Sequence, residues 1–134
     1  FGKGRQVVEG HELTVITWGA MVQKSLEAIK LLELSNDIVE VIDLRTLNPI
    51  DMEIIESSIE KTGKVLVVHE DNVTNGPGAE ISAIIADRFF ELLDGPVRRV
   101  AAKDSPIPFN WHIEEKILPQ TQDVANTIKE LLEY

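Results

Sequence analysis

The residues best suited to chemistry follow a strongly apolar run in the middle of the chain. His69 comes directly after Val65–Val68, and the carboxylates of Glu70 and Asp71 come next. An imidazole beside a carboxylate can titrate near neutral pH and act as a general base. Adjacent residues of a strand point to opposite faces, however, so Glu70 does not by itself orient the His69 ring. His69 is therefore a candidate general base without a fixed partner.

The loop after His69 could also bind an anion. Gly76 and Gly78 let the backbone approach a ligand closely, and the next helix would offer free N–H groups and the positive end of its dipole. The loop lacks the third glycine of a GxGxxG motif and the Lys-Ser/Thr pair of a P-loop, and Glu70 and Asp71 would repel a phosphate. We therefore favour a structural turn with an interface role. Anion binding by His69, Gly76 and Gly78 is the alternative.

No other catalytic pattern emerges from the sequence. Cysteine is absent, which excludes a disulfide scaffold and a Cys-based zinc site, and the three histidines lie in separate segments without metal-ligand spacing. Ser57 and Ser58 are expected on the polar face of a helix, and there is no GxSxG nucleophile elbow. Asp43 and Arg45 are expected to form an architectural ion pair. We therefore assign no catalytic, cofactor-binding or metal-binding residue to the chain.

A proline-rich apolar segment near the end of the chain is a candidate interface. Residues 104–111 read Asp-Ser-Pro-Ile-Pro-Phe-Asn-Trp and are expected to lie outside regular structure. Prolines reduce the entropy lost on docking, and aromatic side chains offer a large apolar contact area. The alternative is that the segment folds back over its own domain. The candidate interface residues are Asp104, Pro106, Ile107, Pro108, Phe109 and Trp111.

Strands and helices that alternate along the chain are expected to position these residues. Runs of β-branched and apolar residues predict five strands, over residues 5–9, 13–18, 38–43, 64–69 and 97–101. Amphipathic helices of about 10–16 residues between buried strands are typical of a parallel sheet with helices on both faces. The sequence therefore predicts a single α/β domain with three layers over residues 1–134. The carboxyl ends of four strands would share one edge of the sheet, at Trp18, Asp43, His69 and Ala101.

The ends and buried faces of the helices carry signals of their own. Asp51 is a good N-cap because its carboxylate can accept from free backbone N–H groups, and Gly63 suits a left-handed C-cap. Two further helices are expected over about residues 78–93 and from Thr121 or Asp123 to the chain end. The first helix is expected to bury a stripe formed by Val22, Leu26 and Ile29, which Met21, Ala28 and Leu32 widen.

The composition is that of an acidic globular domain. The 134 residues carry a formal net charge of −10 at pH 7, which would repel the phosphate backbone of a nucleic acid. Such a surface suits a basic protein partner, although it also serves solubility alone. No apolar run approaches the about 20 residues of a membrane helix, so no membrane association is expected. The first residue is Phe1 rather than methionine, and we expect the chain to be part of a longer polypeptide.

Six motifs in the same order resemble the beta subunit of 2-oxo acid dehydrogenase complexes. Residues 39–51 read VEVIDLRTLNPID and are similar to the EVIDLRTLxPxD signature of that family. Each motif alone is weak, but the six together cover nearly the whole chain. The other matching segments are residues 14–22, 61–64, 69–81, 96–101 and 104–109.

The resemblance implies a transketolase C-terminal domain, with a mixed five-stranded sheet that has one antiparallel edge strand. In that family, the complete enzyme decarboxylates pyruvate or a branched-chain 2-oxo acid on thiamine diphosphate with Mg²⁺ and acylates a lipoyl group. The cofactor lies between the alpha subunit and a different domain of the beta subunit. The resemblance therefore implies an assembly domain that binds no cofactor alone, and it leaves the 2-oxo acid open.

The resemblance also implies partners: an alpha subunit, a second beta subunit and the basic subunit-binding domain of the lipoyl transacylase. Glu133 and Tyr134 at the acidic chain end suit that basic domain. The implied location is a bacterial or archaeal cytoplasm or the mitochondrial matrix. Two alternatives stay open. They are another thiamine-diphosphate enzyme, of the transketolase or deoxyxylulose-phosphate synthase type, and a free-standing regulatory module that binds anions.

Overall fold

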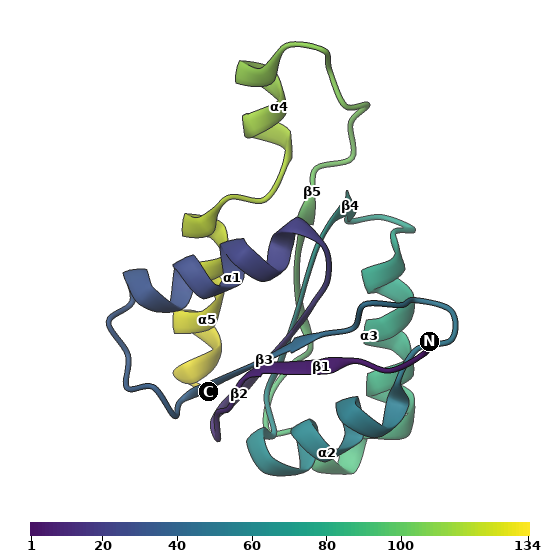
Figure 1. The fold of residues 1–134 in the computed structure, drawn as a ribbon, viewed down its shortest axis with the longest axis vertical. Helices are drawn as coiled ribbons and strands as arrows, with labels where there is room; N and C mark the ends of the chain where they lie inside the picture. The colour runs from purple at the N-terminus through teal and green to yellow at the C-terminus, as the bar shows by residue number, and fades with distance from the viewer.

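A computed structural model describes residues 1–134 and shows one sheet of five strands. The strands are ordered β1-β3-β2-β4-β5 across the sheet. Strand β1 runs antiparallel to β3, and the other neighbouring strands are parallel (Figure 1). The mixed, mostly parallel sheet is therefore confirmed. The strands are β1 (Arg5–Val8), β2 (Leu13–Thr17), β3 (Val39–Asp43), β4 (Val65–Asn72) and β5 (Arg98–Ala102).

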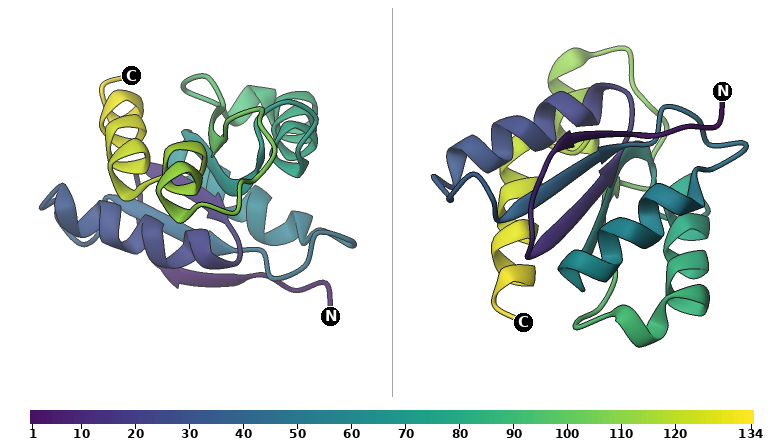
Figure 2. Two further views of the ribbon diagram at one scale, coloured as in Figure 1. Left: turned by 90° about the horizontal axis from the view of Figure 1, so that it is seen from above. Right: turned by 60° about the horizontal axis from the view of Figure 1, so that its bottom comes forward.

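Helices cover both faces of this sheet and make three layers. Helices α1 and α5 pack on one face, and α2 and α3 pack on the other (Figures 1 and 2). The helices are α1 (Ala20–Leu31), α2 (Met52–Thr62), α3 (Pro77–Arg88), α4 (Trp111–Ile117) and α5 (Thr121–Leu132), with a 3-10 turn η1 (Phe90–Leu92) after α3.

The alternation of side chains along the strands divides the interior into two cores. Val15 of β2 and Leu66 of β4 point toward α1 and α5, whereas their neighbours Ile16 and Val67 point toward α2 and α3. All four side chains are fully buried. Because the central strands bury both faces, they read as continuous apolar runs in the sequence.

Both predicted caps of α2 are confirmed. The Asp51 carboxylate accepts a hydrogen bond from the Ile54 backbone N–H at 3.4 Å, and Gly63 ends the helix at a left-handed φ of 64°. Burial opposes ionisation of Asp51. Hydrogen bonds from the Gly4 and Ile54 backbones and the charge of Lys3 outweigh that effect and lower the pKa of the carboxyl group. The cap therefore also fixes the N-terminal segment, through the Gly4 N–H at 2.9 Å.

Several expectations about individual side chains are wrong. Ser58 is buried instead of lying on a polar face, because its hydroxyl bonds to that of Thr14 at 2.6 Å. Asp43 and Arg45 form no ion pair; the Asp43 carboxylate accepts instead from the Arg45 backbone N–H at 3.0 Å. The buried residues of α1 are Met21 and Ala28, which were expected at the side of the stripe, and Ser25, while Val22, Leu26 and Ile29 are half-buried. The centre of the stripe is shifted because the helix contacts both the sheet and α5.

Some element boundaries also differ from the predictions. Helix α3 ends at Arg88 rather than near residue 93, and the chain then tightens into η1. Strand β4 extends to Asn72 because its end pairs with Ala102 of β5. The N-cap of α5 is Gln120, which forms a capping box with Asp123. The end of β4 depends on pairing with a distant strand, whereas the capping box of α5 depends on two residues three positions apart.

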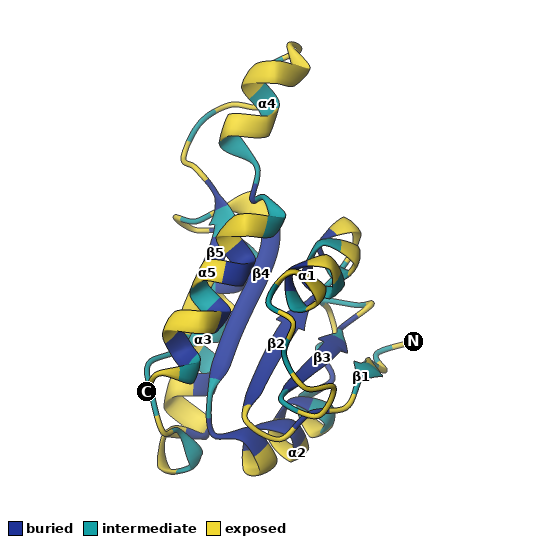
Figure 3. Cartoon of the chain, turned by 90° about the vertical axis from the view of Figure 1, so that its left-hand side faces the viewer, coloured by how far each residue is buried: buried dark blue, intermediate teal, exposed yellow.

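Residues 103–119 form an arm that stands away from the body of the domain (Figures 1 and 3). The segment was expected to be irregular, but it contains α4, whose start is capped by the Asn110 side chain. The backbone N–H of Lys103 donates to the carbonyl of Ile117 at 3.1 Å, so the two ends of the arm meet. The arm does not fold back over the sheet, and its aromatic side chains are exposed. No helix in the structure is long and apolar enough to cross a membrane.

Candidate functional site

The shared direction of the parallel strands places the ends of β2, β4 and β5 along one edge of the sheet. Trp18 follows β2 at this edge, and His69 lies in β4 close to it. The two rings are stacked, with centroids 5.3 Å apart and planes 6° apart. The predicted arrangement of strand ends therefore brings Trp18 and His69 into contact, a pairing that no local sequence pattern indicates.

The His69 ring is enclosed on its other side by the loop glycines. The ring has no exposed surface, and a Cβ on Gly78 would overlap its Nε2 atom. A Cβ on Gly76 would lie 3.0 Å from Cε1 of the ring and would overlap the Asn72 carbonyl oxygen. Both glycines are therefore required by the close approach of the ring and the backbone. The space that an anion would need beside Gly78 is filled by imidazole.

The environment of His69 favours its neutral form. Both ring nitrogens are buried and lack a hydrogen-bond partner. Burial is the largest effect and lowers the pKa of the imidazole; Asp71 acts against this shift and Arg99 adds to it. The ring has no exposed surface through which a substrate could reach its nitrogens. Its proposed roles as a base or as part of an anion site with Gly76 and Gly78 remain predictions.

Four hydrogen bonds connect the loop after His69 to β5 and the arm. The Asp104 carboxylate accepts from the Thr74 backbone N–H at 3.0 Å and from its hydroxyl at 2.5 Å. These two bonds lower the pKa of the Asp104 carboxyl group, and the Arg99 charge adds to the effect. The Val73 N–H donates to the Ala102 carbonyl at 2.9 Å, and the Arg99 guanidinium donates to the Val73 carbonyl. The loop and the base of the arm are thus one hydrogen-bonded unit.

The arm presents most of the candidate interface residues to solvent. Phe109 is fully exposed, and the Trp111 side chain is 59% exposed. The Trp111 ring stacks on that of His112, with centroids 3.5 Å apart. Of the remaining candidates on the arm, Pro106 and Ile107 are exposed and Pro108 is half-buried. An apolar surface that is stiffened by prolines and covered by nothing in its own domain is suited to protein contact.

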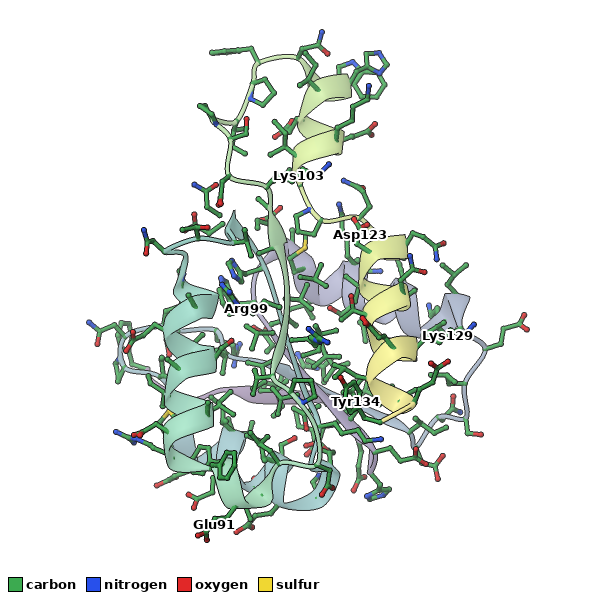
Figure 4. All side chains as sticks on the ribbon, turned by 180° about the vertical axis from the view of Figure 1, so that it is seen from behind. Glu91, Arg99, Lys103, Asp123, Lys129 and Tyr134 are labelled. Atoms are coloured by element: carbon green, nitrogen blue, oxygen red, sulfur yellow. The ribbon has the colours of Figure 1, made fainter.

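A cavity of about 550 Å³ lies where the arm joins the body. Its lining combines cations and anions, among them Arg99 and Lys103 from the β5 side and Asp123 at the start of α5 (Figure 4). The Asp123 carboxylate is already used by the Gln120 N–H in the capping box. This mixed lining gives the cavity no clear preference for one ligand charge.

The candidate residues at the chain end form a separate surface. Glu133 and Tyr134 follow the last turn of α5, whereas the arm joins its first turn (Figure 4). Helix α5 has 12 residues, so about 18 Å separates the two surfaces. Both residues are exposed, beside a cavity of about 410 Å³ whose apolar residues include Leu31 and Leu132. The structure therefore does not bring all predicted interface residues together.

No group of three or more His, Asp or Glu side chains is placed to hold a metal ion. The buried residues with charge are used structurally. Glu40, for example, accepts from the Gly10 N–H at 3.3 Å and pairs with Lys61. These buried carboxylates therefore serve the fold.

The chain matches known proteins along nearly its whole length. Residues 2–124 match the family described as transketolase, C-terminal domain. The chain is 43% identical to the pyruvate dehydrogenase E1 component subunit beta of Staphylococcus epidermidis over 133 residues, which are 99% of the chain and 41% of that protein. It is 39% identical to the subunit of the same name from Rickettsia bellii over 131 residues, which are 98% of the chain and 40% of that protein.

A solved structure supports the same assignment. The chain superposes with a TM-score of 0.81 on a protein described as a split gene transketolase, inactive beta4 tetramer. The two are 30% identical, and the match covers 98% of this chain and 42% of that one. The chain thus spans about two fifths of the length of the proteins it matches. From the family match and the five-stranded mixed sheet together, we conclude that the chain belongs to the transketolase C-terminal domain family.

Proposed function

We propose that this chain is the assembly domain of a 2-oxo acid dehydrogenase beta subunit. Its similarity to pyruvate dehydrogenase E1 beta subunits along 98–99% of the chain carries the proposal. These relatives favour pyruvate as the substrate of the complete enzyme over a branched-chain 2-oxo acid. The complete enzyme would use thiamine diphosphate and Mg²⁺, held by residues outside this chain. The bacterial relatives favour a cytoplasmic location over the mitochondrial matrix.

The proposed partners use two different surfaces. The exposed arm would contact the alpha subunit or a second beta subunit. It offers Phe109 and Trp111, and aromatic residues contribute strongly to the centres of interfaces. The acidic end at Glu133 and Tyr134 would contact the basic subunit-binding domain of a lipoyl transacylase. The negative net charge supports that choice and argues against nucleic acid as a partner.

The arm is tested by removing its aromatic side chains in the full-length beta subunit. We expect Phe109→Ala and Trp111→Ala each to weaken assembly with the other subunits by about tenfold or more, as loss of a central aromatic residue does. Dissociation constants from analytical ultracentrifugation would measure this effect. Phe90→Ala is the matched control, because Phe90 is 73% exposed but lies in η1, away from the arm. Equal effects of all three changes would contradict the proposal.

Two alternative functions lead to different expectations from those of an assembly domain. Another thiamine-diphosphate enzyme, such as a transketolase, would share the fold, and the solved split gene transketolase shows that likeness. The names of the two relatives described above favour the dehydrogenase instead. A free-standing anion-binding module would bind inorganic phosphate with a measurable heat. The assembly domain would give no such heat in a calorimetric titration of this chain.

A further inference from the structure

His69 is the one group in the domain whose two buried polar atoms both lack a partner. It lies in β4 and is enclosed by residues of two other segments, which are Trp18 after β2 and Gly76 and Gly78 around the start of α3. None of these three neighbours carries a charge or a free acceptor side chain. These surroundings therefore favour a neutral imidazole, because they include no side-chain group that would stabilise an imidazolium.

We propose that protonation of His69 opens the loop of residues 73–76, which follows β4, and releases the arm from its fixed position. Two charges act on the ring, Asp71 of β4 and Arg99 of β5, and their effects oppose each other. The stacked Trp18 ring, the N-cap Gly76 and Gly78 of α3 add no compensating charge. A protonated ring therefore reaches hydration only if the loop moves away, because a buried ion without a partner is strongly disfavoured.

The direction of the pH effect follows from the same contacts. Burial lowers the pKa of His69 below its ordinary value of 6.5 in the closed state, while an open loop would let it return to that value. The open form then binds more protons than the closed form as pH falls below about 6.5, so low pH favours opening. If the closed ring stays neutral, the open population rises about tenfold between pH 7.5 and 5.5.

The hydrogen bonds of the loop transmit this opening to the arm. Thr74 is held by Asp104, the first candidate interface residue of the arm, and Val73 is held by Ala102 and Arg99 at its base. Opening the loop breaks these bonds and leaves the arm attached through its own two ends. The consequence for docking rests on the proposed function of the arm; the opening itself does not.

Hydrogen–deuterium exchange of the full-length polypeptide, followed by mass spectrometry, tests the switch. After correction for the intrinsic pH dependence of exchange, peptides covering residues 70–76 and 103–111 should exchange about tenfold faster at pH 5.5 than at pH 7.5. His69→Phe and His69→Leu should abolish that response, because neither side chain titrates. His112→Gln is the control and should respond like the wild type, because His112 lies exposed on the arm.

Each outcome decides one part of the proposal. Unchanged exchange in the wild type, or an equal response in both His69 variants, would overturn the switch. Peptides of β2 and α5 report whether a variant has lost its fold. Asp104→Ala should uncouple the arm, so that only residues 70–76 exchange faster at low pH. If in the wild type residues 70–76 exchange faster at low pH and residues 103–111 do not, the coupling between loop and arm is overturned. A loop and arm that respond while Phe109→Ala leaves assembly intact would refute the proposed function and leave the switch standing.

Discussion

At the scale of single residues, the chain buries a few polar groups and satisfies most of them from distant segments. The Glu40 carboxylate of β3 is 2% exposed and joins three parts of the fold: Gln6 of β1, the Gly10 backbone and Lys61 of α2. This carboxylate therefore fixes the antiparallel edge strand and α2 to the same strand. The exceptions are the hydroxyls of Thr17 and Ser25 and both ring nitrogens of His69, which have no partner. The buried His69 ring is therefore sensitive to protonation, whereas the buried Glu40 carboxylate stabilises the fold.

Removing the cation beside Glu40 should therefore be costly. We expect Lys61→Met to lower the free energy of unfolding by about 1–3 kcal/mol, less than for a fully buried pair because Lys61 is 35% exposed. The double variant Glu40→Gln/Lys61→Met should recover part of this loss, because no buried charge is then left alone. Urea unfolding at pH 7 measures both values. A double variant that is less stable than Lys61→Met would show that the loss of stability does not come from breaking the ion pair.

At the scale of elements, the consecutive helices α4 and α5 differ in how much they contribute to the buried core. Helix α5 buries Val124, Ile128 and Leu131 against α1 and the sheet, whereas α4 buries no residue at all. We expect Ile128→Ala to lower the free energy of unfolding by about 2–5 kcal/mol, because it removes packing at a fully buried position. Ile113→Ala, on the exposed surface of α4, should change it by less than about 0.5 kcal/mol. Thermal unfolding followed by circular dichroism compares the two, and equal losses would place α4 in the core.

Local signals explain which elements could be predicted from the sequence. The Asp51 and Gly63 caps depend on residues next to the helix ends, and the central strands depend on continuous apolar runs, so both were predicted correctly. The burial of Ser58 depends on Thr14, 44 residues away, and the stacking of Trp18 on His69 depends on the strand order. The bond between Thr74 and Asp104 joins two loops. No local pattern encodes such contacts, so the part of the site that links the loop to the arm appeared only in the folded chain.

At the scale of the whole molecule, the net charge of −10 sets how the domain meets other chains. Attraction between this surface and a basic partner is screened beyond a Debye length of about 8 Å at physiological ionic strength. If the chain end binds the subunit-binding domain of a lipoyl transacylase, we expect that affinity to fall about tenfold or more between 50 and 500 mM salt, an order-of-magnitude estimate for steering by opposite charges. Isothermal titration calorimetry would measure the affinity at each concentration.

A pair of matched variants locates the charge that matters. Glu133→Gln should weaken this binding and reduce its salt dependence, because Glu133 lies at the proposed contact. Glu91→Gln removes the same charge from η1, on the opposite face of the sheet, and should change the affinity little. If the affinity does not change with salt concentration, or changes equally in both variants, the partner binds elsewhere on the domain.

The meeting of the two ends of the arm has a practical consequence for engineering. The backbone hydrogen bond between Lys103 and Ile117 closes the base, and Asp104 ties that base to Thr74. We therefore expect a shorter arm that keeps these two attachments to leave the register of the sheet unchanged.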